Sequence, residues 1–156
     1  TAHARLDGGT TQANRPSTDV SLGVTALQNA VIQFHLWKND RGRPFISVPK
    51  MLVLHPNDLM TARELLGSEY KPGTANNEIN ALKEDGLSYM VSHYVTDTNA
   101  WFLLGDNHDL NFIWDLRPTV TSDTEFKTDT ILRKVKQAYS FGFGEWRGCY
   151  GSSGVS

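Results

Sequence analysis

The sequence has little of what usually identifies an enzyme, a membrane protein or a disulfide-rich domain. Cys149 is its one cysteine, so it can form neither an intrachain disulfide nor a cysteine zinc cluster. No apolar run approaches the about 20 residues that a membrane-spanning helix needs. The net charge is only −2, without a long run of either sign, which argues against a strongly basic nucleic-acid-binding domain.

Motifs for metal chemistry are also missing. The histidines do not pair at the spacing that places two imidazoles on one metal ion, and no HExxH motif occurs. Asp106, His108 and Asp109 form the best metal-like cluster, but the run GDNHDLN that contains them is typical of a hydrophilic strand connector. We therefore expect a turn there and not a metal site.

Patterns for nucleophilic or phosphate chemistry are equally weak. Ser92 and His93 are neighbours on an expected strand, so their side chains point to opposite faces and cannot act as nucleophile and base. The glycines of GFGEWRG (142–148) have neither of the phosphate-loop spacings. Cys149 stands alone beside an aromatic residue, which is typical of a structural thiol. The sequence thus predicts no catalytic residue, no metal site and no cofactor.

Length and composition predict a folded protein. The chain has 156 residues, of which 39% are hydrophobic and 21% charged, enough for one globular domain or two small subdomains that share a core. Residues 1–16 are rich in Thr, Gly, Ala and Asn and carry no apolar periodicity. We expect a loop there, and we interpret the chain as a piece of a longer product.

Two helices are predicted from apolar residues that recur at helical spacing. The first follows Asp19 and ends by Asn39, with Ser21 or Thr25 as its N-cap. Its apolar face consists of Leu27, Ala30, Val31, Phe34 and Trp37. The second helix opens at Pro56-Asn57-Asp58, carries Leu59, Ala62, Leu65 and Leu66, and is closed by Gly67. Residues 68–85 are polar and turn-rich, so we expect an exposed loop with little structure.

Strands are expected in the remaining segments. Residues 45–56 alternate and then run apolar, and residues 87–94, 100–105 and 110–116 are short strand candidates. Their connectors are short and hydrophilic, which predicts an antiparallel meander. Residues 130–143 fit a helix or a strand by periodicity alone, and their aromatic and glycine content favours one long strand.

The stretch AYSFGFGEWRGCYGSSG (138–154) alternates aromatic residues with glycine and serine. In a strand Tyr139, Phe141 and Phe143 share one face, and we expect this face to fill the core of the chain against the first helix. Trp146 and Arg147 are residue types that commonly anchor interfaces between chains. For these two residues, packing within the chain and contact with another chain both remain open.

An ordered set of fragments resembles the major capsid proteins of tailed bacteriophages. The set comprises PKMLVLHP (49–56), TARELLGS (61–68), a strand that ends in Ser-His-Tyr (92–94), AWFLLGD (100–106) and the closing run EFKTDTILRKVKQAYSFGFGEWRGCYGSSG (125–154). Together the fragments cover most of the chain from about Ser21 onward, in the order that the family uses. The order of the set, and not any single fragment, carries the resemblance.

This resemblance implies an α+β fold of the Hong Kong 97 (HK97-like) type. Residues 21–51 and 129–156 would form the peripheral domain, with a spine helix at 21–38 and a long strand from Thr130. Residues 52–128 would form the axial domain, a mixed sheet flanked by helices, and residues 1–20 a loop or linker remnant. Family members also grip their neighbours with an N-terminal arm and an extended loop before the spine helix, which we expect to be removed or to lie outside this chain.

The function implied by the resemblance is structural and not enzymatic. The chain would be a major head protein that self-assembles, through hexameric and pentameric capsomers, into the icosahedral shell around a phage genome. Scaffold, portal or decoration proteins would be further partners, packaged DNA would lie nearby without specific binding, and no membrane would be involved. Assembly would take place in the cytoplasm of the bacterial host and the product would be the virion capsid. Trp146 and Arg147 would be candidates for an intersubunit contact.

The residues alone leave two other hypotheses open. One is a binding module outside any virus that holds a peptide or partner with the glycine–aromatic segment. The other is a metal-dependent hydrolase that uses Asp106, His108 and Asp109.

Overall fold

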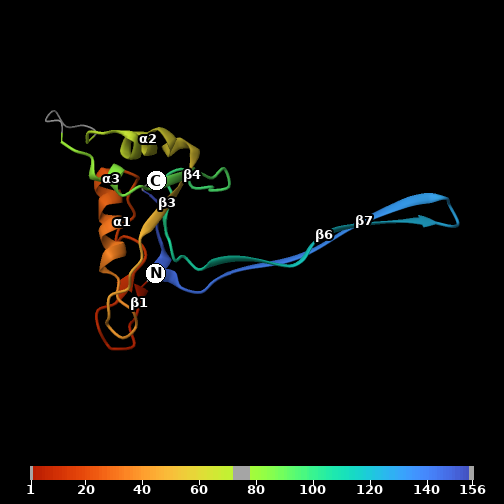
Figure 1. Ribbon diagram of the computed structural model, residues 1–156, viewed down its shortest axis with the longest axis horizontal. Coiled ribbons are helices and arrows are strands. Elements are labelled where there is room, and N and C mark those ends of the chain that lie inside the picture. Colours follow the sequence, from red (N-terminus) through yellow and green to blue (C-terminus); the bar gives the residue numbers. More distant parts are fainter. Residues whose placement is uncertain (1, 72–77, 155–156) are drawn as a thin grey trace. The chain divides into compact units, whose positions relative to one another are not determined.

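The structure, a computed structural model, describes residues 2–71 and 78–154. The chain divides into two compact units: Thr1–His108 with Glu145–Ser156, and Asp109–Gly144. Helices and mixed sheets occur together, as expected for an α+β protein, and Figure 1 labels most of the helices and strands. The division into peripheral and axial domains stays a prediction. Its two boundaries fall within a strand (Pro49–Leu54) and in the turn that follows another strand (Leu110–Glu125).

A four-stranded sheet forms the centre of the first unit, in the order β4-β3-β5-β8. β3 (Pro49–Leu54) pairs in parallel with β4 (Ser88–Val91) and antiparallel with β5 (Trp101–Gly105), and β8 (Cys149–Ser152) adds antiparallel to β5. The predicted antiparallel meander is therefore wrong. β4 and β5 follow one another in the sequence but do not pair, because the chain crosses over from β3 to β4 through helices, as a parallel pair requires.

The crossover contains the second predicted helix. A 3-10 turn, η1 (Pro56–Asp58), leads into α2 (Leu59–Gly67), which buries Ala62 and Leu65. Proline is suited to this first turn because its missing N–H would have no helical partner there. The prediction of this helix is confirmed, including its start at Pro56 and its end at Gly67.

Residues 68–85 are more ordered than the sequence indicated. They include α3 (Ala81–Glu84), whose Leu82 is only 2% exposed, and the buried Asn80. The Asn80 side-chain amide donates to the carbonyls of Leu65 and Ser68 at 2.7 and 3.0 Å and thereby ties this segment to the end of α2. The expectation of an unstructured loop is wrong for the described part, and residues 72–77 lie outside the described residues.

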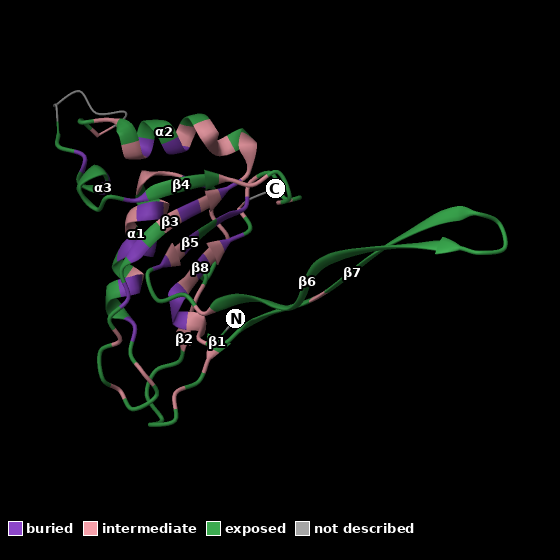
Figure 2. Ribbon diagram, turned by 45° about the vertical axis from the view of Figure 1, so that its right-hand side comes forward, coloured by how far each residue is buried: buried purple, intermediate pink, exposed green. Residues whose placement is uncertain are grey.

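The first predicted helix is α1 (Val24–Leu36), and every residue of its predicted apolar face is buried (Figure 2). The cap prediction is wrong: Gly23 occupies the N-cap position without a side-chain hydrogen bond. The preceding segment is held by other bonds. Val20 donates its N–H to Ser152 Oγ at 2.9 Å, and its carbonyl accepts from Trp101 Nε1 at 2.9 Å. This anchoring fixes Val20 to the sheet three residues before the N-cap.

The core of the first unit lies between α1 and one face of the sheet. Alternate strand residues point toward the helix, as the two-residue period of a strand requires: Leu52 and Leu54 from β3, Trp101 and Leu103 from β5, and Tyr150 from β8. Leu65 and Leu82 extend this core beneath α2 and α3. In the segment expected to be a loop, β1 (Ala2–His3) and β2 (Gln12–Ala13) form a short antiparallel pair.

The second unit is a single long β-hairpin. β6 (Leu110–Glu125) pairs antiparallel with β7 (Thr130–Phe143), which confirms the predicted long strand at 130–143 and extends the strand predicted at 110–116. The register shifts between Trp114 and Leu116 and again between Leu116 and Thr119. The second shift coincides with Pro118, which has no N–H to donate to the ladder and is tolerated in strands at such irregularities.

The ordered part of residues 68–85 gives the first prediction. Leu82→Ala removes a buried side chain and should lower the free energy of unfolding by about 2–4 kcal/mol in urea titrations. Ile79→Ala, at a position that is 74% exposed, is the control and should change it by less than about 0.5 kcal/mol. Equal effects would mean that this segment does not contribute to the core.

Candidate interaction surface

One face of the hairpin gathers its aromatic residues. Residues paired across an antiparallel ladder lie on the same face, and here Leu110 pairs with Phe143, Phe112 with Phe141 and Trp114 with Tyr139. We call these six residues the aromatic face. The pairs that alternate with them lie on the opposite face, where Asn111 pairs with Gly142 and Ile113 with Ser140.

The rings of the aromatic face pack on one another. Phe112 stacks on Tyr139 with centroids 5.2 Å apart and an angle of 25°, and Trp114 meets both rings nearly edge-on at 5.2 and 5.7 Å. The contacts are within the favourable range for aromatic pairs and order the surface. A hollow of ≈ 410 Å³ lies beside them, lined by Leu110, Asn111, Phe112, Phe141, Gly142 and Phe143.

The aromatic face is not part of the core, so that prediction is wrong. Tyr139, Phe141 and Phe143 are 51%, 78% and 77% exposed, and exposed residues line the length of the hairpin in Figure 2. The two-residue period of a strand correctly predicted that these rings share one face. It does not predict whether a second layer of secondary structure covers that face. A two-stranded hairpin has no second layer of its own. Phe34 and Trp37, their expected partners, pack on each other instead, with centroids 4.4 Å apart.

The outer half of the hairpin carries cations without cross-strand carboxylates. Lys136 pairs with Thr119, Lys134 with Thr121 and Arg133 with Ser122. Opposite charges in such positions would stabilise the hairpin, yet each cation faces a hydroxyl group. Within the residues that the structure describes, none of these three side chains makes an ion pair.

Trp146 and Arg147, the two candidate contact residues, lie together in the first unit, in the 3-10 turn η2 (Trp146–Gly148). Arg147 is only 4% exposed. Its guanidinium donates to the Lys38 carbonyl at 2.9 Å, to Asp40 Oδ1 at 2.5 Å and to both carboxylate oxygens of Glu145 at 2.9 and 3.0 Å. These bonds connect the segment after α1 with the segment before β8.

Trp146 extends the same cluster. Its ring stacks on His3 with centroids 4.0 Å apart and an interplanar angle of 5°, meets Trp37 nearly edge-on, and lies 4.5 Å from the Arg147 guanidinium carbon. Contacts within the chain therefore account for both candidate residues. Their contact with a neighbouring subunit stays a prediction. In the sequence, the only sign of this internal role is Trp37 at the end of the first predicted helix, which is the ring that Trp146 contacts.

A glycine is required next to this cluster. A Cβ at Gly148 would lie 2.4 Å from the Cα and 2.7 Å from the backbone nitrogen of His108. Backbone atoms cannot move aside as a flexible side chain can, so only glycine lets the two segments approach this closely. Gly148 is thus a packing residue and not part of a phosphate-binding loop.

The residues considered for metal chemistry serve the turn after β5. The Asp106 carboxylate accepts from the Val48 N–H at 3.0 Å, and Asp106 N–H donates to the Val48 carbonyl at 2.9 Å. Asp109 belongs to the hairpin unit, where its carboxylate accepts from the Asn111 side chain at 2.5 Å. No group of three or more His, Cys, Asp or Glu side chains suited to a metal ion occurs among the described residues.

The two nucleophile candidates are also structural. β4 ends at Val91, so Ser92 and His93 lie beyond the strand on which they were predicted, and Ser92 Oγ accepts from the Tyr94 N–H at 3.4 Å. Cys149 is a half-buried free thiol on β8, and burial raises its pKa above the ordinary value. A raised pKa disfavours the thiolate, which is the reactive form.

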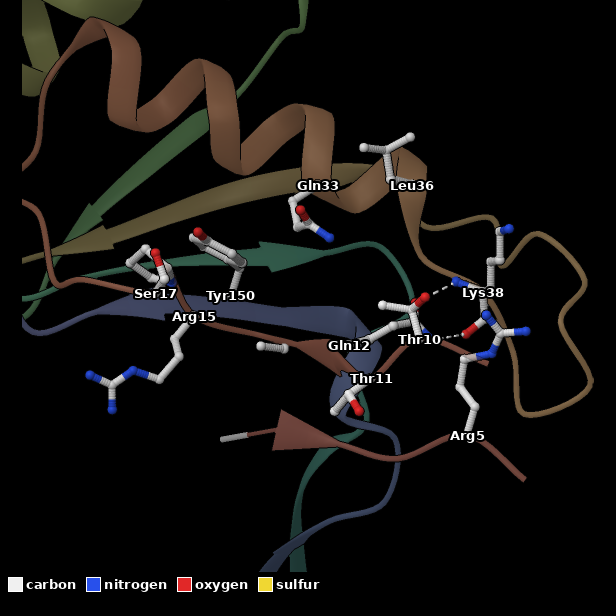
Figure 3. Close-up of a pocket in the computed structure, with 12 residues that line it drawn as sticks. Arg5, Thr10, Thr11, Gln12, Arg15, Ser17, Gln33, Leu36, Lys38 and Tyr150 are labelled. Atoms are coloured by element: carbon white, nitrogen blue, oxygen red, sulfur yellow. Dashed lines mark hydrogen bonds between the residues drawn. The ribbon is translucent and has the colours of Figure 1, made fainter. Parts of the chain in front are cut away.

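A hollow with several polar side chains lies near the end of α1 and has a volume of ≈ 430 Å³ (Figure 3). Both of its arginines have partners: Arg5 pairs with Asp7, and Arg15 pairs with Asp19 at 2.6 Å. Gln12 closes one side, because its side-chain amide exchanges two hydrogen bonds with the Lys38 backbone at 2.9 and 2.8 Å. These bonds hold β2 against the segment after α1, a structural role.

The sequence matches the phage capsid protein family over residues 1–152. This span takes in both units of the fold and nearly the whole chain. The chain belongs to the phage capsid protein family. Capsid proteins of this family form a structural, non-enzymatic class whose members assemble with other capsid subunits in the virion capsid. No curated protein matches the sequence significantly.

Family membership changes how the exposed surfaces are interpreted. A capsid protein must bury part of its surface against other subunits, so exposed apolar residues are expected where those contacts form. Because the aromatic face of the hairpin is apolar and exposed, it is the best candidate for an intersubunit surface.

The described chain contains no helix of the length and apolar character needed to cross a bilayer.

The Arg147 cluster gives a second prediction. Arg147→Ala leaves the Asp40 and Glu145 carboxylates without their buried partner and should lower the free energy of unfolding by about 2–3 kcal/mol. Arg133→Ala on the hairpin, where no ion pair is lost, is the matched control and should change it by less than about 0.5 kcal/mol. Urea unfolding followed by tryptophan fluorescence measures both, and equal losses would contradict an internal role for Arg147.

The pKa of Cys149 gives a third prediction. Because burial raises the pKa of this thiol in the folded state, the unfolded chain ionises first as the pH rises. The thiol's contribution to stability is present below its unfolded pKa and should fall as the pH rises above about 8.5. Cys149→Ser should abolish this part of the alkaline loss of stability. Iodoacetamide should modify native Cys149 much more slowly than the thiol in urea, and equal rates would show an accessible, reactive thiol.

Proposed function

We propose that this chain is a subunit of a major head protein of the HK97-like type, which self-assembles into the icosahedral shell around a phage genome. The family match supports the capsid role, and the helix α1, the mixed sheet and the long strand β7 are compatible with this fold. The sequence fragments that resemble tailed-phage capsid proteins occur in both units.

The aromatic face is the observation that carries the proposal of self-assembly. Its five aromatic residues are 40–78% exposed. An aromatic side chain buries about 150–250 Å² when it is fully covered. Because more than half of the surface of these five side chains is still exposed on average, covering them completely would remove about a further 450–750 Å² from water. A standard interface buries about 800 Å² on each partner, so this face alone approaches one side of an interface.

The proposed domain arrangement follows the predicted boundaries. Residues 21–51 and 129–156 would belong to the peripheral domain and residues 52–128 to the axial domain, with copies joined in hexameric and pentameric capsomers. Scaffold, portal and decoration proteins are further proposed partners, and assembly would occur in the host cytoplasm. Many weak contacts repeated around a closed lattice together make a durable shell. Each single contact stays reversible while the shell forms, so errors in assembly can be corrected.

The test compares two substitutions on opposite faces of the hairpin. Phe141→Asp places a charge in the aromatic face and should shift the protein from large assemblies to monomers in sedimentation velocity and electron microscopy. Ser140→Asp places the same charge at the neighbouring exposed position on the opposite face and should assemble as the unchanged protein does.

Both variants should keep the melting temperature of the unchanged protein, because both positions are exposed. A protein that stays monomeric without substitution, at all concentrations tested, would contradict self-assembly. Formation of a one-to-one complex with an unrelated partner would then favour the binding module.

A further inference from the structure

The turn that closes the hairpin presents an isolated aromatic side chain. Phe126 is fully exposed, at 101% of its reference surface, between Glu125 and Lys127. The turn is held by the Asp129 N–H, which donates to the Glu125 carbonyl at 2.9 Å, and by Thr128 Oγ1, which donates to Glu125 Oε2 at 3.0 Å. Phe126 thus stands on an ordered turn with no intrachain surface covering it.

A hollow in the first unit has the size and chemistry to receive such a ring. It lies between α2 and β4 and has a volume of ≈ 480 Å³. Leu66 and Leu87 give it apolar walls, and Arg63, Ser88 and Tyr89 give it a polar rim. An enclosed apolar cavity of about 150 Å³ holds a benzene ring. This hollow is larger and open to solvent on one side, so a phenylalanine side chain can enter it.

The charges beside the ring and beside the hollow are complementary. Glu125 and Lys127 flank Phe126, and Arg63 and Glu64 stand next to each other at the exposed side of α2. Arg63 uses its Nε to donate to Tyr89 Oη at 3.3 Å, which leaves its terminal nitrogens for a carboxylate. A ring placed in the hollow can therefore be flanked by two opposite-charge pairs, Glu125 with Arg63 and Lys127 with Glu64.

We propose that Phe126 of one copy inserts into the hollow between α2 and β4 of a second copy. This inference rests on the proposed self-assembly and identifies one contact within it. Anchors of this kind, an aromatic side chain in a pocket with a polar rim, supply much of the binding energy of an interface.

The length of the hairpin favours a second copy as the occupant. β6 has 16 residues and spans about 50 Å when extended. A compact unit of about 120 residues is about 35 Å across, so the hairpin is longer than the unit from which it arises. The tip of an extended hairpin is therefore too far from its base to reach a hollow on its own unit. The tip and the hollow are different surfaces, so the contact is head-to-tail and can close copies into a ring.

Disulfide trapping tests the contact between copies. On a Cys149→Ser background, one preparation of the full chain carries Thr128→Cys, which keeps the Phe126 ring on the same turn, and another carries Ser88→Cys at the rim of the hollow. Mixing them under mild oxidation should give a crosslinked dimer, at least about tenfold more than either preparation alone. Tyr94→Cys, on an exposed turn away from the hollow, replaces Ser88→Cys as the matched control and should give little dimer. Equal yields for both pairs would overturn the proposal.

A chain that carries Thr128→Cys and Ser88→Cys together tests the other occupant, the chain's own hollow. Crosslinking that stays intramolecular at every dilution would overturn the contact between copies. Dimers and larger species that grow with concentration support it.

Charge reversal gives an independent readout on assembly. Lys127→Glu should raise the concentration needed for assembly by about tenfold, and Glu64→Lys in the same chain should restore it, because the pair is re-formed with exchanged signs. Melting temperatures should stay unchanged. If the unchanged protein assembles but neither variant alters assembly, the tip contact is wrong and self-assembly stands. If the unchanged protein does not assemble, the proposed function itself fails.

Discussion

In a two-stranded β-ladder the backbone groups between the strands form hydrogen bonds, but no other layer covers the side chains. This constraint determines the properties of the hairpin unit. β6 and β7 pair along almost their whole length, so their inner N–H and C=O groups have partners. No second layer belongs to the unit, so the aromatic face stays exposed. An isolated hairpin is marginally stable in water, and a partner surface is the usual remedy.

The first unit solves the same problem internally. α1 covers one face of the sheet, and the Arg147 cluster joins the segment after α1 to the start of β8. The hydrogen bonds of Val20 to Ser152 and Trp101 hold the other end of the helix to the same sheet. The unit therefore has its own core and a satisfied buried arginine, while the aromatic residues of the hairpin remain available for other chains.

Sequence reasoning succeeded where the signal is local. Helical spacing identified the buried face of α1, Pro56 and Gly67 marked the ends of the η1–α2 helical segment, and aromatic content identified β7 as a strand. It failed where the structure of a segment depends on residues far away in the sequence. The parallel pairing of β3 with β4 depends on a crossover, and Asn80 orders its segment through carbonyls 12 and 15 residues away. Periodicity placed Tyr139, Phe141 and Phe143 on one face but carried no information on what covers them.

The same limit applies to the residues that the sequence proposed for an intersubunit contact. Trp146 and Arg147 are interface types by composition, yet here a buried arginine with several acceptors serves the fold of its own chain. Phe126 drew no attention in the sequence because a lone phenylalanine between two charged residues resembles an ordinary turn. Its full exposure on an ordered turn is visible only in three dimensions. For a subunit that works by contact, exposed apolar residues that its own fold leaves uncovered are better evidence of function than residue type.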